Sequence, residues 1–143
     1  MGETMFLTRL IYVSTIYENA AQETLEDILK VSRDNNTKNN LTGMLCFNRK
    51  YFLQCLEGSR TNVNETYNRI LKDNRHGNII ILDYSEINAR DFADWSMAYA
   101  PSSSMTATIN LMFSGSKEFN PYDLPSNSAY LMMLELKKIL SSV

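Results

Sequence analysis

The order of its hydrophobic runs is the feature that most constrains how this chain can fold. Short runs rich in β-branched and aromatic residues alternate with segments in which apolar residues recur every three or four positions. The first pattern is typical of strands and the second of amphipathic helices. We expect strands at 7–14, 41–48, 51–56, 79–84 and 95–100, and helices at 22–36, 61–73, 105–113 and 128–141.

This order predicts an α+β fold. It runs β-α-β-β-α-β-β and ends with two helices, and its first six elements match the split βαβ arrangement of ferredoxin-like domains. Right-handed crossovers place the first two helices on one face of the sheet. The opposite face needs a cover, so we expect the two C-terminal helices, or an oligomer, to bury it. The run 79–84 is apolar enough to predict an interior strand.

Pro101 and the serines at 102–104 mark a boundary in the chain. The length of 143 residues suits a single compact unit. We therefore expect a sheet domain over residues 1–101 and a helical extension over residues 102–143.

Charge and composition exclude several classes of protein. The 14 basic and 16 acidic residues give a net charge of −2, which argues against binding nucleic acid or an anionic membrane by bulk charge. The sequence has no secretory signal and no apolar run of the ~18–20 residues that span a bilayer, so we expect a cytoplasmic protein without membrane attachment. Cys46 and Cys55, with a single histidine, make no metal site and are expected to be buried in a reducing compartment.

Four polar side chains fall at inward-facing positions of the predicted elements: Tyr12, Ser32, Asn36 and Gln54. One interpretation is a buried hydrogen-bond network that satisfies itself. The other is a pocket for a planar ligand, because an amide offers a donor and an acceptor side by side. The pattern alone leaves both open.

The two helices supply residues that would suit such a pocket. Ile28 and Ile70 lie on their inward faces, where they could sandwich a ring. Arg69 and Asp73, four residues apart at the far end of the second helix, could hold a polar tail. The pattern indicates a slot between two helices and does not name its ligand.

Several stretches of the chain together resemble the BLUF family, flavin-binding sensors of blue light. The similarity covers about residues 7–100, and the two C-terminal helices look like those of short, single-domain members. One departure is Asn74, where a glutamate is common in the family. The matching stretches are Arg9–Ser14, Asn35-Asn36, Asn40–Leu45, Phe52–Gly58, Asn64–Tyr67, Arg69-Ile70, Asp73-x-Arg75-His76 and Phe92-x-x-Trp95-Ser96-Met97.

The resemblance implies a set of roles for particular residues. It implies FAD, or FMN or riboflavin, bound non-covalently between the two helices, with Tyr12 and Gln54 as the photochemical pair. The cofactor-binding residues that it implies are Asn35, Asn36, Gln54, Arg69, Asp73, Ile28, Ile70 and His76. The signal-relay residues that it implies are Trp95, Met97 and Ser32.

The function implied by the resemblance is that of a blue-light photoreceptor, not an enzyme. In this hypothesis Tyr12 gives an electron and a proton to the excited flavin by way of Gln54. Gln54 ends rotated or tautomerised, with a new hydrogen bond to a flavin carbonyl and a reversible red shift. The change passes through the strand at 95–100 and the C-terminal helices to a protein partner. The resemblance also implies a homo-oligomer.

Other functions of the same fold remain as alternatives. An acylphosphatase-like hydrolase needs a phosphate-cradling loop, and the link 15–21 has no glycine to form one. A sheet that binds RNA would use Phe47, Tyr51 and Phe52, but such sheets are usually basic. A regulatory module for another small molecule is the third alternative. His76, just after the second helix, is also explained as a partner of that helix's C-terminal dipole.

Overall fold

The computed structural model describes residues 6–17, 22–101, 103 and 106–141, so the expected boundary at Ser102 lies outside the described residues. Strands and helices occur in the predicted order. The elements are β1 (Leu7–Ile16), α1 (Gln22–Lys38), β2 (Thr42–Phe47), β3 (Tyr51–Ser59), α2 (Arg60–Lys72), β4 (His76–Glu86), β5 (Ala98–Pro101), α3 (Ala107–Phe113), the 3-10 helix η2 (Pro121–Asp123) and α4 (Ser126–Ser141).

The strands form one mixed sheet in the order β4-β1-β3-β2-β5. The first four pair antiparallel, as a ferredoxin-like fold requires, and β5 adds to β2 in parallel. The predicted fold class is confirmed. β1 and β3 lie inside the sheet, and their pairing sets Tyr12 opposite Gln54.

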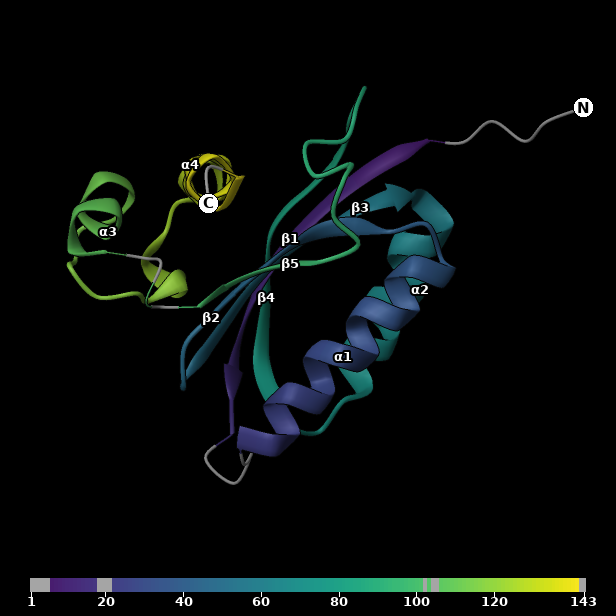
Figure 1. The fold of residues 1–143 in the computed structure, drawn as a ribbon, viewed down its shortest axis with the longest axis horizontal. Helices are drawn as coiled ribbons and strands as arrows, with labels where there is room; N and C mark the ends of the chain where they lie inside the picture. Colours follow the sequence, from purple (N-terminus) through teal and green to yellow (C-terminus); the bar gives the residue numbers. More distant parts are fainter. Residues whose placement is uncertain (1–5, 18–21, 102, 104–105, 142–143) are drawn as a thin grey trace, which may run out of the picture.

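Helices cover both faces of the sheet, as predicted (Figure 1). On one face, Leu10, Tyr12 and Leu56 pack beneath α1 and α2. On the other, Ile11 and Val13 share a buried cluster with the apolar stripe of α4, which consists of Met132, Met133 and Leu136. The central strands β1 and β3 therefore divide their side chains between two apolar layers by simple alternation.

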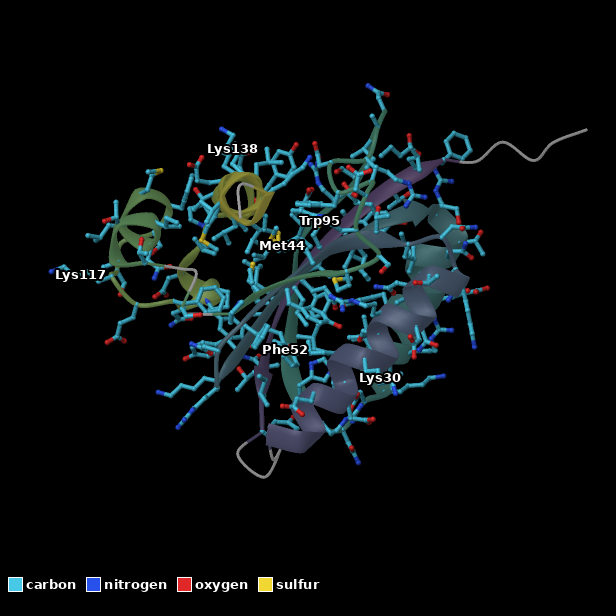
Figure 2. All side chains as sticks on the ribbon, in the orientation of Figure 1. Lys30, Met44, Phe52, Trp95, Lys117 and Lys138 are labelled. Carbon is cyan, nitrogen blue, oxygen red and sulfur yellow. The ribbon has the colours of Figure 1, made fainter. Side chains whose placement is uncertain are left out.

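Phe52 shows what this double cover means for the alternative functions. Its ring is 3% exposed and lies edge-on to His76, with ring centroids 6.0 Å apart. Figure 2 shows Phe52 on the α1 side of the sheet. A ring buried under helices cannot stack on a nucleic-acid base, so this residue offers no support for an RNA-binding sheet.

The expectation of an interior strand at 79–84 is wrong. That run lies in β4, which is the outermost strand beside β1. Ile80 and Ile81 point to opposite faces, and each remains 46% exposed. An apolar run shows that a segment favours a sheet, but its place in the sheet depends on the crossover connections.

The expected strand at 95–100 is shorter than predicted. β5 begins at Ala98, and the three residues before it belong to the preceding loop. The backbone N–H of Trp95 donates to the carbonyl of Phe92 at 3.0 Å, which closes a turn and breaks the alternation. As a result, Trp95 packs on the α4 side while Met97 packs on the α1–α2 side. A regular strand over 95–100, as predicted, would put these two side chains on one face by alternation, and that expectation is wrong.

Gly43 lies close to the backbone of Cys55 in the β2–β3 ladder and gives a test of the fold. A β-carbon there would lie 1.9 Å from the backbone oxygen of Cys55, an atom that cannot move aside. We expect Gly43→Ala to lower the free energy of unfolding by about 1–3 kcal/mol, measured by urea denaturation.

Gly115→Ala is the matched control, since nothing lies within 4 Å of a β-carbon at that position. We expect it to change the unfolding free energy by less than about 0.5 kcal/mol. Equal stability of the two variants would contradict the described β2–β3 packing.

Candidate functional site

A cavity of about 170 Å³ lies between α1 and α2 above β3. α1 and α2 both cross this face of the sheet. The cavity lies where polar side chains take the place of the apolar ones that pack these helices on the sheet elsewhere. Eight residues singled out from the sequence line it: Ile28, Ser32, Asn35, Asn36, Gln54, Arg69, Ile70 and Asp73. The sequence-based slot between the helices is thus a real cavity.

The floor of the cavity carries a hydrogen bond between Tyr12 and Gln54. The two residues are direct partners in the β1–β3 register, so their side chains emerge side by side. The phenol O–H of Tyr12 donates to Oε1 of Gln54. Burial raises the pKa of Tyr12 above its ordinary value, and the side chain is only 2% exposed. The phenol therefore keeps its proton and acts as a donor.

Gln54 also contacts the segment that leads into β5. Its Nε2 donates to the sulfur of Met97 at 3.7 Å, and Met97 is 2% exposed. Trp95 does not approach Gln54, because its ring stacks on Phe92 with centroids 6.2 Å apart. Of the two predicted relay residues on this segment, Met97 packs in the α1–α2 layer against Gln54, and Trp95 packs in the opposite layer.

Asn36 ties the pocket wall to the same segment. Its Nδ2 donates to the carbonyl of Ser96 at 3.1 Å, which leaves Oδ1 as an acceptor on a side chain that is almost fully buried. Asn35 and Ser32, on the same helix, are half-buried at the cavity wall. Amide and hydroxyl groups thus gather along one side of the cavity.

The open end of the cavity is charged. Asp73 accepts hydrogen bonds from Arg75 Nε at 2.9 Å and Arg75 Nη2 at 2.7 Å. These bonds lower the pKa of the Asp73 carboxyl. Arg69 instead donates to the hydroxyl of Thr66 at 3.1 Å. Oδ2 of Asp27 also lies 3.7 Å from Nη1 of Arg75, so two carboxylates and two guanidinium groups meet at this end.

His76 is absent from the cavity lining in the described part of the chain. Its Nδ1 lies 2.8 Å from Ser14 Oγ and its Nε2 lies 3.0 Å from the carbonyl of Ile70. The ring thus links β1 to the last turn of α2. The carbonyl that it contacts, that of Ile70, lies at the C-terminal end of α2, where the dipole-partner interpretation expects the histidine to be.

Sequence reasoning missed three lining residues: Val31, Thr66 and Arg75. Helical spacing could have found two of them. Val31 follows Ile28 by three positions, and Thr66 precedes Ile70 by four, so each lies on the face of a predicted pocket residue. Arg75 lies beyond the end of α2, where no period applies.

Glu57 is a second omission. Its side chain is fully buried, and its carboxylate accepts from the backbone N–H groups of Asp91 at 2.7 Å and Phe92 at 3.0 Å. The hydroxyl of Thr42 adds a third bond at 2.9 Å. This carboxylate fastens the β4–β5 loop to β3. Alternation would have revealed it, since Glu57 shares the apolar face of Leu53.

The cavity fits the edge of a planar heterocycle with amide-like groups. A closed space of about 150 Å³ already holds a benzene-sized ring, so this open one admits part of a larger ring system. Ile28 and Ile70 offer apolar surface on the two helices, while Asn36 and Gln54 offer donors and acceptors. A flavin has this combination of a flat apolar body and a polar edge.

Two further features of the described residues bear on the class of site. Among residues 6–17, 22–101, 103 and 106–141, no three His, Cys, Asp or Glu side chains gather as metal ligands would. Within the same part of the chain, every helix is too short or too polar to cross a membrane.

Comparison with known proteins points to one family. The family model described as "Sensors of blue-light using FAD" (BLUF) matches residues 7–98. The blue light- and temperature-regulated antirepressor BluF of Escherichia coli (strain K12) is 36% identical over 86 residues, which are 60% of this chain and 21% of that protein. The chain thus spans about a fifth of the length of this curated relative.

Solved structures agree over nearly the whole chain. The ground state of BlsA matches with a TM-score of 0.82 and 34% identity, over 91% of this chain and 87% of that one. The dark state of BlrB, titled a BLUF protein, matches with a TM-score of 0.79 and 25% identity, over 99% of this chain and 100% of that one. The similarity therefore includes α3 and α4.

The charged end of the cavity yields a pH prediction. Arg75→Ala removes the side-chain bonds that hold the pKa of Asp73 down, so that pKa should rise toward 3.8, measured by ¹³C NMR of the carboxyl carbon. Because the folded pKa is the lower one, the stabilisation from this pair is present above the unfolded pKa and lost as pH falls through the folded value.

Arg49→Ala serves as the control, since Arg49 lies on the β2–β3 turn and takes no part in this pair. It should leave the Asp73 titration in place. An unchanged Asp73 pKa in Arg75→Ala would refute the assigned cause.

Proposed function

We propose, since this chain belongs to the BLUF family of blue-light sensors, that it detects blue light with FAD bound in the α1–α2 cavity and signals to a protein partner. The observation that carries this proposal is the buried hydrogen bond from Tyr12 to Gln54 at the cavity floor. It supplies a phenol that can lose an electron and a proton together, next to a group that can take the proton.

The cavity residues divide the work of binding. Ile28 and Ile70 would pack the two sides of the ring, and Asn35 and Asn36 would bond its polar edge. Arg75 is shared between the carboxylates of Asp73 and Asp27, so Arg69, which bonds the Thr66 hydroxyl, is the guanidinium that favours a phosphate-bearing flavin tail over riboflavin. A phosphate is common to FAD and FMN, so the choice of FAD rests on the family description, with FMN as the alternative.

A bound flavin supplies the colour and, when excited, a strong one-electron oxidant. Tyr12 would supply one electron to the bound flavin, and its phenolic proton would move along the existing hydrogen bond to Oε1 of Gln54 while Nε2 of Gln54 releases a proton toward the flavin. Once the electron and a proton have returned to Tyr12, Gln54 would remain rotated or tautomerised, so that a different edge of the amide faces the cavity. In a dry site the rearranged bonds persist, because no water competes for them.

The signal leaves through the segment before β5. A turned Gln54 gives up its bond to Met97, two residues from Trp95. The Trp95 ring stacks on Phe92, which belongs to the same buried cluster as α4. One or two altered hydrogen bonds supply about 1–3 kcal/mol, enough to shift a two-state contact about 5–150-fold.

Asp91 gives this route a polar connection to α4. Its carboxylate accepts from the hydroxyl of Tyr130 at 2.9 Å, and its backbone carbonyl accepts from Lys137. Glu57 fixes the other side of Asp91 to β3. The loop is therefore fastened both to the strand that carries Gln54 and to the output helix.

We extend the proposal to the whole chain. Residues 1–101 form the sensor, and residues 102–143 form the segment whose docking changes with light. The protein acts as a switch without catalysis of its own, in the cytoplasm, as a homo-oligomer. The E. coli relative is named an antirepressor, and this supports a protein as the partner rather than nucleic acid or a membrane.

Tyr12→Phe tests the photochemical pair. The variant keeps the ring in the core and removes the donor O–H, so it should bind flavin and stay yellow. We expect no reversible red shift of its flavin absorption band under blue light. Gln54→Leu should likewise show no light-induced shift.

Tyr67→Phe is the matched control, because that ring lies 5.9 Å from Tyr12 and its hydroxyl takes no part in the Tyr12–Gln54 bond. Its red shift should persist. A normal photocycle in Tyr12→Phe would end the donor assignment.

Hydrogen exchange tests the output route. We expect blue light to speed amide exchange in α4 about fivefold or more, measured by mass spectrometry, while β1 stays protected. Tyr12→Phe should show no such change. Identical dark and lit exchange in α4 of the wild-type chain would eliminate α4 as the output element.

A further inference from the structure

Three hydrogen bonds join α1 to the segment 96–99. Asn36 bonds the carbonyl of Ser96, as described above. Arg33 Nη2 donates to the carbonyl of Met97 at 3.1 Å. The hydroxyl of Tyr99 donates to the carbonyl of Leu29. Met97, which lies in this segment, is the residue whose side chain reaches Gln54.

Arg33 is the outermost member of this set. The side chain is exposed, yet its guanidinium carbon lies 4.3 Å from the centre of the Tyr99 ring while Nη2 bonds the Met97 carbonyl. The ring and the carbonyl together fix a planar guanidinium, which a lone surface bond would not do. Tyr99 in turn is held to α1 through Leu29.

Met97 is thus held at two ends. Its backbone carbonyl faces outward to Arg33, and its sulfur faces inward to Nε2 of Gln54. A thioether is a weak acceptor on a flexible side chain, so its own bond does little to fix its position. The bond from Arg33, together with that from Asn36 to Ser96, therefore helps to fix the backbone that carries the sulfur.

We propose that Arg33, braced on the Tyr99 ring, is a positioning residue that holds the Met97 sulfur against Gln54 and thereby sets the lifetime of the lit state. The inference rests on the proposed photosensor function. Gln54 must recover its bond to Met97 when the dark state returns. If the sulfur drifts, that bond re-forms more slowly, and the lit state lasts longer.

The size of the effect follows from the contact that is lost. A hydrogen bond of this kind changes an equilibrium or rate by about 2–10-fold, so Arg33→Ala should lengthen lit-state recovery by that factor. The Tyr12–Gln54 bond does not involve Arg33. The dark flavin band and the size of the red shift should therefore match those of the wild-type chain.

The experiment follows dark recovery of the flavin band after blue illumination in the flavin-loaded full chain. Arg33→Lys is the partial-rescue variant, because an ammonium can still donate to the Met97 carbonyl and lie over the Tyr99 ring but loses the planar stacking, so its lifetime should fall between those of wild type and Arg33→Ala. Lys30→Ala, on an exposed position of the same helix, should leave recovery unchanged (Figure 2). Tyr99→Leu removes the brace and should lengthen recovery in the same direction as Arg33→Ala.

Two results overturn the inference. One is an Arg33→Ala lifetime that is unchanged or shorter, and the other is an Arg33→Lys lifetime as long as that of Arg33→Ala. If Arg33→Ala fails to hold flavin, Tyr99→Leu decides, and an unchanged lifetime there counts against the proposal. A wild-type chain without any light-induced shift would instead refute the photosensor function itself, so the two failures are distinct.

Discussion

The hydrogen bond between Tyr12 and Gln54 depends on one property of antiparallel sheets, their register. The two residues are direct partners in the β1–β3 ladder. A slip of one residue would turn Gln54 to the opposite face and place Cys55 beneath the helices. Burial of both faces makes such a slip costly, because every apolar side chain of the strand would change layers. The packing that builds the core therefore also aligns the donor with its acceptor.

The same alternation lets β3 serve two layers at once. Gln54 faces the cavity under α1 and α2, whereas Glu57 faces the α4 layer and holds the loop before β5. That loop then crosses the sheet edge, with Trp95 on the α4 side and Met97 on the cavity side. A movement at the cavity floor can reach the outer helix along a short path, which is the physical basis of the proposed output.

The residues that the sequence predicted well are those governed by local periods. Tyr12 of β1 and Gln54 of β3 fall on one face of the sheet by alternation, and Asn36 falls on the inward helical stripe. Trp95 was misplaced because a turn closed by its own N–H interrupts the alternation. The β4 run was misplaced because hydrophobicity does not distinguish an edge strand from a central one.

The sequence by itself determined the order of the elements, the two apolar layers and the polar residues that face the cavity, because side-chain direction follows from the strand and helix periods. Tertiary structure alone decided the partners. Arg75 pairs with Asp27 of α1, Glu57 bonds a loop more than thirty residues away, and Arg33 reaches the carbonyl of Met97. Those choices depend on which distant segments meet in space, and no local period in the chain encodes them.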